Sequence, residues 1–191
     1  MAKASRFSHA VLSSYNKDAM VKWYTEALGG EVVWDLPFFS ILTFDEEHHR
    51  IGVMQLQGEP QEKSPLGLNH LAFAFDNVPE LLGHYKMLKA AGNAPLFCTN
   101  HGITWSLYFN DPDGNTVEFF VDLMSPAEAT EFMTKPEFMA NPGGVPFDPD
   151  ELLAKLEADA PLEEIIFFDG ERNLRDGAAL REAQLAAAKG E

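Results

Sequence analysis

The sequence contains very little cysteine and few basic residues. Cys98 is the only cysteine among 191 residues, so the chain can form neither an intrachain disulfide nor a zinc site built from thiolates. Fourteen Lys and Arg stand against 30 Asp and Glu, a formal net charge of −16, and such a charge repels the phosphates of nucleic acids and anionic lipids. We therefore expect no nucleic-acid partner and no membrane partner.

Long apolar runs are also absent from the start of the chain. The segment MAKASRFSHAVLSSY has no stretch typical of a signal peptide or a membrane span, so we expect a cytoplasmic protein. Hydrophobic residues make up 46% of the chain and charged residues 23%, which is typical of folded globular proteins rather than disordered ones. The length suits one domain, or one domain with an extension.

The hydrophobic pattern predicts the same series of elements twice. The first series is a strand, a helix and three strands, at 7–13, 19–28, 31–34, 39–44 and 50–57. The second series repeats this order, at 68–75, 78–91, 96–99, 103–109 and 116–122. Gly29–Gly30 and Gly92 follow the two helices, where glycine is a common helix end. We therefore predict two tandem βαβββ modules, residues 7–57 and 67–122.

His9 and His70 occupy matching places in the two modules. They lie 61 residues apart, in FSHAVL and LNHLAF, and this correspondence favours an internal repeat. Its period is longer than that of most solenoids, so we expect two modules packed around one shared cavity. The predicted fold class is α+β, with a domain at residues 1–123 whose modules form a curved mixed sheet around a metal cavity.

Residues 124–191 differ in character from both modules. They lack strand-like alternation and contain two predicted helices, at 150–158 and 174–189. They also carry 6 Lys and Arg against 15 Asp and Glu, which is more than half of the excess negative charge. We predict a helical C-terminal extension that covers the cavity or an oligomer interface.

Three side chains on predicted strands have the chemistry of metal ligands: His9, His70 and Glu118. Two imidazoles and one carboxylate leave positions open on Fe(II) for a substrate and O2, although Zn(II) and Mn(II) accept the same ligand types. Glu118 lies among apolar residues in TVEFFVD, where a buried carboxylate without a cation is costly. The alternative interpretation of each histidine is a core residue whose hydrogen bonds are satisfied.

With the tandem modules, these residues resemble the vicinal oxygen chelate superfamily, which includes glyoxalase I, epimerases and type I extradiol dioxygenases. Residues 99–118, TNHGITWSLYFNDPDGNTVE, are similar to the signature of the extradiol branch: a His, an apolar residue before Tyr, Asp-Pro-x-Gly and a metal-binding Glu. The resemblance implies a one-domain extradiol dioxygenase that cleaves a small catecholic substrate with O2. It implies Fe(II), or alternatively Mn(II), bound by His9, His70 and Glu118.

The resemblance also implies roles for three further residues. His49, the second histidine in DEEHHRIGVMQ, corresponds to an acid/base residue, a role that imidazole suits at neutral pH. Tyr108 would hydrogen-bond a substrate oxygen, and His101 would stabilise the deprotonated hydroxyl. His84, in the second predicted helix, has no partner pattern and is expected at the surface. Superfamily members are usually dimers, so the resemblance implies a homo-oligomer, a dimer or larger.

Two other functions stay open. Gln55 lies where glyoxalases and epimerases of the superfamily place a fourth metal ligand, so a glyoxalase- or epimerase-type lyase or isomerase is the second hypothesis. Full coordination by protein would leave less room for a catechol and O2. The third hypothesis is a non-catalytic protein that binds a small ligand, although such members of the superfamily generally lack the metal triad.

Overall fold

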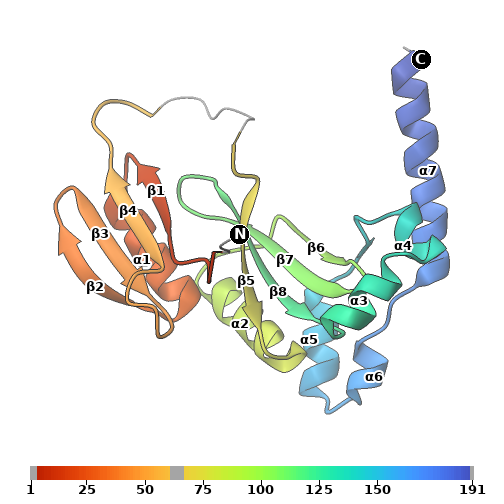
Figure 1. Cartoon of the computed structure of the whole chain (residues 1–191). Helices are drawn as coiled ribbons and strands as arrows, with labels where there is room; N and C mark the ends of the chain where they lie inside the picture. The colour runs from red at the N-terminus through yellow and green to blue at the C-terminus, as the bar shows by residue number, and fades with distance from the viewer. Residues whose placement is uncertain (1–3, 61–66, 190–191) are drawn as a thin grey trace. The chain divides into compact units, whose positions relative to one another are not determined.

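The structure, a computed structural model, describes residues 4–60 and 67–189, with side chains of the last helix described up to residue 179 (Figure 1). The chain forms two compact units. The first comprises Met1–His70 and Asn110–Thr116, and the second comprises Leu71–Phe109 and Val117–Glu191. Each unit is described by itself below. The predicted domain boundary at residue 123 stays a prediction.

The first unit contains a four-stranded sheet and one helix. Its elements are β1 (Ala10–Ser14), α1 (Lys17–Leu28), β2 (Glu31–Leu36), β3 (Phe39–Thr43) and β4 (Ile51–Gln55). The strand order is β1-β4-β3-β2, with β1 parallel to β4 and β3 antiparallel to both of its neighbours. The helix begins after Asn16, whose side chain accepts a hydrogen bond from the Ala19 amide. Its spaced apolar residues form the buried side: Met20, Trp23, Tyr24 and Ala27.

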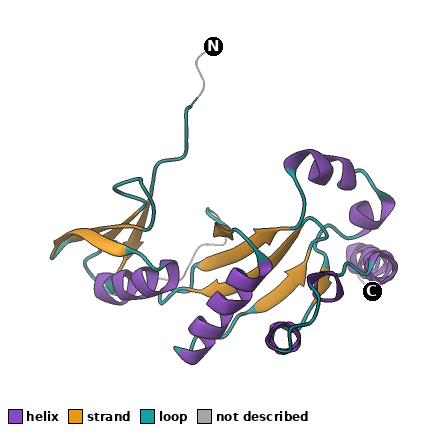
Figure 2. Ribbon diagram, turned by 90° about the horizontal axis from the view of Figure 1, so that it is seen from below, coloured by secondary structure: helices purple, strands orange, loops and turns teal. Residues whose placement is uncertain are grey.

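Residues 70–122, most of which belong to the second unit, repeat this order of elements. They are β5 (His70–Phe75), α2 (Val78–Ala90), β6 (Phe97–Asn100), β7 (Thr104–Asn110) and β8 (Thr116–Asp122). The strand order is β5-β8-β7-β6, which matches the order of the first sheet. The predicted α+β class and the two βαβββ modules are therefore confirmed. Figure 2 shows the helices of this unit (purple) beside its strands (orange).

The C-terminal segment supplies five helices and one further strand. They are α3 (Pro126–Phe132), α4 (Pro136–Ala140), β9 (Val145–Pro146), α5 (Pro149–Glu157), α6 (Leu162–Ile165) and α7 (Gly170–Lys189). The expectation of an extension without strands is wrong, because β9 pairs antiparallel with the outer edge of β6. A two-residue strand is too short to show alternation, and proline is typical of edge strands. No helix among the described residues is long and apolar enough to cross a membrane.

His84 is half-buried against aromatic rings of the second unit rather than exposed at its surface. Its ring centroid is 4.6 Å from that of Phe75 and 4.5 Å from that of Phe119. The surface prediction is wrong because His84 falls three residues after the buried Leu81, on the helix face that covers the sheet. Burial lowers the pKa of His84 to about 4, so the imidazole is neutral at neutral pH.

Candidate active site

The first unit brings two of the predicted site residues together. His9 is exposed and immediately precedes β1, so its predicted place inside the strand is wrong by one residue. Strand pairing starts one residue later, where the Ala10 amide donates to the Arg50 carbonyl at 3.0 Å. The ring centroids of His9 and His49 lie 4.8 Å apart. A predicted metal ligand and the predicted acid/base residue are therefore neighbours.

Glu47 is a site residue that the sequence did not reveal. Its Oε1 lies 3.5 Å from Nδ1 of His49, and its Oε2 accepts a hydrogen bond of 2.7 Å from Nε of Arg6. The Arg6 guanidinium holds the pKa of the Glu47 carboxyl below its usual value, so Glu47 is an anion beside the imidazole. Glu47, His48 and His49 also place ligand atoms within 4.8 Å of one another. In the sequence, the only indication that Glu47 lies beside His49 is that an acidic residue stands two positions before this histidine.

Gln55 is bound to the backbone at the junction of β1 and α1. Its Nε2 donates to the carbonyls of Tyr15, at 3.0 Å, and Leu56, at 2.8 Å. Its Oε1 accepts from the Lys17 amide at 3.1 Å. These three bonds explain why an amide side chain ends β4. They give Gln55 a structural role and do not favour it as a fourth metal ligand.

The second unit buries Glu118 against a tyrosine. Glu118 in β8 and Tyr108 in the neighbouring β7 are each 8% exposed. The Tyr108 hydroxyl donates to Oε1 of Glu118 at 2.9 Å. Burial, and then the charge of Glu118, raise the pKa of Tyr108 above its usual value, so the phenol keeps its proton at neutral pH. Sequence reasoning predicted both residues as site residues, and the structure brings them into direct contact.

His101 extends this contact into a chain of three side chains. Its Nδ1 lies 3.0 Å from the Pro142 carbonyl, which can only accept, so Nδ1 carries a proton. Its Nε2 lies 3.3 Å from the Tyr108 hydroxyl. Since Nδ1 is fixed as a donor, a neutral His101 presents the lone pair of Nε2 to the phenol. The single Tyr108 hydroxyl proton therefore has two possible acceptors, Oε1 of Glu118 and Nε2 of His101, and it is donated to one of them at a time.

The C-terminal segment binds the two residues that precede His101. Thr99 Oγ1 donates to the Gly143 carbonyl, and Asn100 Nδ2 donates to the Phe167 carbonyl, each at 2.8 Å. Gly144 has a φ of +80°, and a Cβ there would lie 2.2 Å from the Asn100 carbonyl oxygen. Only glycine permits so close a backbone approach. The segment is therefore a support for the His101 position as well as a cover for the sheet edge.

The turn between β7 and β8 is organised by Asp111. Its Oδ1 accepts from the amides of Asp113, at 3.0 Å, and Asn115, at 2.8 Å. Its Oδ2 accepts from the Tyr24 hydroxyl of α1 at 3.1 Å. Asp111 is 4% exposed, so these bonds replace the water that it loses. The Asp-Pro-x-Gly motif thus fixes the turn from which β8 runs to Glu118.

His70 opens β5, the strand beside β8. Its Nδ1 lies 2.7 Å from Oδ1 of Asn69, and an amide oxygen only accepts, so Nδ1 carries the proton and the lone pair is on Nε2. Phe73 and Phe75 of β5 contact Phe119 of β8. Since side chains alternate along a strand, His70 and Glu118 fall on the sheet face opposite these rings.

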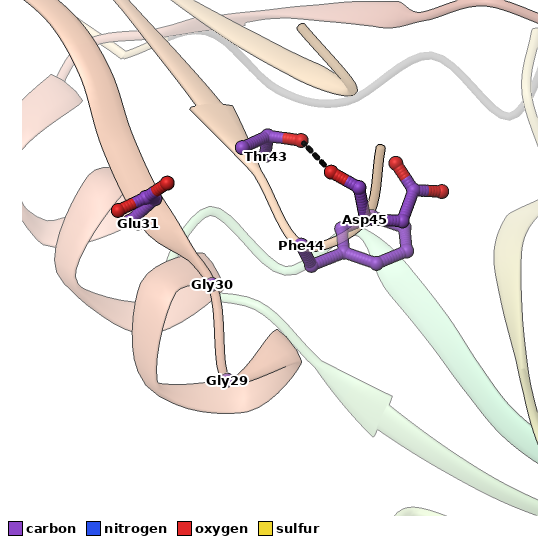
Figure 3. Close-up of a pocket in the computed structure, with 6 residues that line it drawn as sticks. All are labelled: Gly29, Gly30, Glu31, Thr43, Phe44 and Asp45. Atoms are coloured by element: carbon purple, nitrogen blue, oxygen red, sulfur yellow. Dashed lines mark hydrogen bonds between the residues drawn. The ribbon is translucent and has the colours of Figure 1, made fainter. Parts of the chain in front are cut away.

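A polar pocket of about 440 Å³ in the first unit lies at the end of α1 (Figure 3). It is lined by Gly29, Gly30, Glu31, Thr43, Phe44 and Asp45. The dashed line in Figure 3 is the hydrogen bond of 3.2 Å that Thr43 Oγ1 donates to the Asp45 carbonyl. None of the predicted site residues lines this pocket. The predicted site residues lie elsewhere, in two groups: His9 with His49 in the first unit, and His101 with Tyr108 and Glu118 in the second.

Comparison with known proteins gives one consistent family. Residues 6–119 match the Glyoxalase/Bleomycin resistance protein/Dioxygenase superfamily. Biphenyl-2,3-diol 1,2-dioxygenase 2 of Rhodococcus globerulus is 40% identical over 168 residues, which cover 86% of this chain and 88% of that protein. Biphenyl-2,3-diol 1,2-dioxygenase 3 of the same organism is 37% identical over 169 residues, covering 86% and 89%. A glyoxylase/bleomycin resistance protein/dioxygenase domain from Frankia sp. EAN1pec has a TM-score of 0.53 at 23% identity, covers 63% of this chain and 99% of that one, and supports the fold.

Proposed function

The chain belongs to the Glyoxalase/Bleomycin resistance protein/Dioxygenase superfamily, and on this premise we propose that it is an extradiol dioxygenase that opens the ring of a catecholic substrate with O2. The observation that carries the proposal is the chain of His101, Tyr108 and Glu118. It brings the three signature residues together, with Tyr108 between two groups that can each accept its hydroxyl proton. Two relatives at 40% and 37% identity are named for cleavage of an aromatic diol, biphenyl-2,3-diol.

We propose that His9, His70 and Glu118 hold the metal, and that the metal is Fe(II) or alternatively Mn(II). The residues fit such an ion, because two neutral imidazoles and a carboxylate form the facial ligand set of non-haem Fe(II) oxygenases. The Asn69 amide that accepts from Nδ1 of His70 orients Nε2 as a ligand atom. When bound, the metal supplies a centre at which the diol and O2 meet and exchange electrons. That His9 binds the same metal ion as His70 and Glu118 stays a prediction from the sequence.

The remaining residues move or hold protons in this proposal. His49 accepts a proton from a diol hydroxyl and later returns it, and Oε1 of Glu47 lies 3.5 Å from its Nδ1. The Tyr108 hydroxyl, which donates to Glu118, would hydrogen-bond a substrate oxygen in this proposal. His101 stabilises the deprotonated hydroxyl by acting through Tyr108. By the same family resemblance we propose a homo-oligomer, a dimer or larger.

Oxygen uptake with absorbance scanning tests the proposal. The protein is reconstituted with Fe(II) without air and then given air with 2,3-dihydroxybiphenyl or 3-methylcatechol. We expect one O2 consumed per diol, a yellow ring-opened product, and loss of both signals in His70→Ala. Asp122→Asn, an exposed change at the end of β8, serves as the matched control and keeps the activity. Absence of uptake from protein that verifiably contains iron would contradict the proposed function.

A further inference from the structure

The second unit contains a cavity between its sheet and the C-terminal helices. The volume is about 320 Å³, at the lower end of pockets that hold small molecules, roughly 300 to 1,000 Å³. Trp105 of β7 forms part of its wall. Strand pairing is regular from Trp105 to Tyr108, so alternation places these two side chains on opposite faces of the sheet. None of the predicted site residues lines this cavity, which is therefore separate from the candidate active site.

Trp105 brings a buried N–H group without an acceptor to this cavity. The residue is 1% exposed, and its indole Nε1 makes no hydrogen bond to any of the described residues. Indole nitrogen can only donate. Burial has removed the water that accepts this bond in the unfolded chain, and a native protein rarely leaves such a group unpaired. An acceptor from outside the chain would restore the bond.

The wall beside Trp105 is apolar. The ring centroid of Phe147 lies 5.1 Å from that of Trp105, with 30° between the ring planes. Val145 of β9, Leu152 of α5 and Ile165 of α6 continue this wall and are buried. Aromatic and aliphatic groups around a few polar ones are typical of sites for small organic molecules. A flat aromatic ring suits such a wall.

Two cations line the same cavity although the segment around them is acidic. Residues 124–191 contain six Lys and Arg against 15 Asp and Glu, and two of the six, Lys155 and Arg172, lie at the cavity. Lys155 makes no ion pair within the part of the chain that the structure describes. Arg172 uses Nε for its ion pair with Asp176, at 3.5 Å, and its other guanidinium nitrogens stay available as donors.

Two acids also line the cavity, Glu164 and Asp169. The Asp169 carboxylate is already engaged, because its Oδ1 accepts from the Arg172 amide at 2.8 Å where α7 begins. Glu164 is exposed to water, which weakens its effect on a ligand. The unused hydrogen-bonding capacity of the cavity is therefore mainly that of donors, and it favours a ligand that accepts and carries negative charge.

We propose that this cavity binds a small aromatic carboxylate, whose ring lies against Trp105 and Phe147 and whose carboxylate accepts a hydrogen bond from Nε1 of Trp105. Lys155 and Arg172 attract the negative charge of the ligand. The inference is independent of the proposed function, because no residue proposed for catalysis or metal binding lines the cavity.

Correlation NMR spectra of the whole ¹⁵N-labelled chain test the proposal at the atom that it concerns. The chain has three tryptophans, Trp23, Trp34 and Trp105, and Trp105→Phe assigns one indole N–H signal by its loss. Titration with benzoate should move the Trp105 signal downfield, because its N–H gains an acceptor, and should leave the other two in place. Benzamide has nearly the same shape without the charge, and it should bind about tenfold more weakly or worse.

Lys155→Glu tests the role of charge. It should weaken benzoate binding about tenfold or more, because attraction is replaced by repulsion. Lys135→Glu is the matched control, since it makes the same change of charge in the same segment at a residue that lies over the Phe132 ring and does not line the cavity. It should keep the affinity within about twofold. Trp105→Phe keeps an aromatic wall but loses the N–H, and it should weaken binding about 3- to 10-fold.

Four results would overturn the inference. A Trp105 signal that millimolar benzoate does not move shows that the ligand does not bind there, even if a carboxylate binds at the proposed metal site. Equal affinities for benzoate and benzamide, or for the wild type and Lys155→Glu, show that charge does not select the ligand. A long-lived water beside the Trp105 N–H that benzoate does not displace shows that water is the acceptor. If the melting temperature shows that Trp105→Phe is unfolded, the exposed change Lys155→Glu decides.

Discussion

The two units repeat one topology but hold their site residues in different ways. In the second unit, Glu118 and Tyr108 are each 8% exposed and joined by a hydrogen bond, and His101 is tied to the Pro142 carbonyl. In the first unit, His9 is exposed and the His49 side chain is 32% exposed. The same strand order therefore supports a buried polar network in one unit and accessible site residues in the other.

The two units differ because of the C-terminal segment, which lies outside the repeated βαβββ elements. The second sheet carries β9, which pairs with the edge strand β6, and the Phe167 carbonyl in the following segment accepts a hydrogen bond from Asn100 of β6. The corresponding edge strand of the first sheet, β2, has exposed side chains at five of its six positions. A segment added to one copy of a duplicated fold thus fixes the edge of that copy, while the edge of the other copy stays exposed.

Removal of the buried Glu118 carboxylate from the second unit should have the largest effect on activity. Glu118→Gln keeps the shape of the side chain but loses the charge that a metal requires. We expect oxygen uptake with 2,3-dihydroxybiphenyl to fall by at least about 100-fold, at the upper end of losses measured for groups around metal ligands. Asp122→Asn on the same strand is the control. Retention of activity in Glu118→Gln would show that the carboxylate is a structural residue.

Removing only the hydroxyl of Tyr108 should have a smaller effect on the same network. Tyr108→Phe keeps the ring stacked on Phe97, whose centroid is 4.3 Å away, but disconnects His101 from Glu118. We expect kcat to fall about 10- to 100-fold with iron still bound. Tyr85→Phe, which loses a hydrogen bond to Asp150 on α5, removes a hydroxyl outside the site and should keep kcat unchanged. Equal kcat values for the two variants would contradict the network.

Acid should destabilise the second unit through His84. Its pKa is about 4 in the folded chain and 6.5 in the unfolded chain, so below pH 6.5 the unfolded state binds the proton first. The free energy of unfolding therefore has its full value above pH 6.5. It falls by on the order of 3 kcal/mol as the pH falls toward 4. Urea unfolding at pH 7.5 and 4.5 measures it. His84→Phe should remove this part of the pH dependence, and an unchanged pH dependence would show that His84 is already protonated in the fold.

Loosening the C-terminal segment should have the smallest effect. Asn173 is fully buried, and its Nδ2 donates to the carbonyls of Glu137 and Asn141. Asn173→Ala removes both bonds, and the loss of the donor to a buried carbonyl costs about 1 to 3 kcal/mol and loosens the turn that carries Pro142. We expect faster amide exchange at residues 137–146 and a loss of activity smaller than that of Tyr108→Phe. Arg172→Ala at the exposed neighbouring position is the control, and identical exchange in both variants would contradict the supporting role.

The sequence predicted the parts of the fold that follow from local periodicity. Alternating apolar residues predicted the eight strands of the two modules, and the helical spacing of Met20, Trp23 and Ala27 predicted α1. The burial of Glu118 followed from its apolar neighbours and is confirmed, at 8% exposure. These features depend on residues close together in the chain, so one sequence is sufficient to predict them.

Features that depend on distant residues could not be predicted in this way. The bond between His101 and the Pro142 carbonyl joins positions 41 residues apart, and β9 exists only because β6 offers it an edge. His84 has a polar side chain, and only the packing of α2 on the second sheet shows that it is buried between aromatic rings. The roles of Glu47 and Gln55 likewise depend on which backbone and side-chain groups the fold places beside them.

The central proposal is that His9, His70 and Glu118 hold one metal ion. Iron content after anaerobic loading and gel filtration tests it directly in the wild type and in four variants, His9→Ala, His70→Ala, Glu118→Ala and His48→Ala. The account predicts about one iron per wild-type chain, loss of iron in the first three variants and retention in His48→Ala. Loss of iron in His48→Ala with retention in His9→Ala would place the metal at the group of Glu47, His48 and His49 and contradict the account.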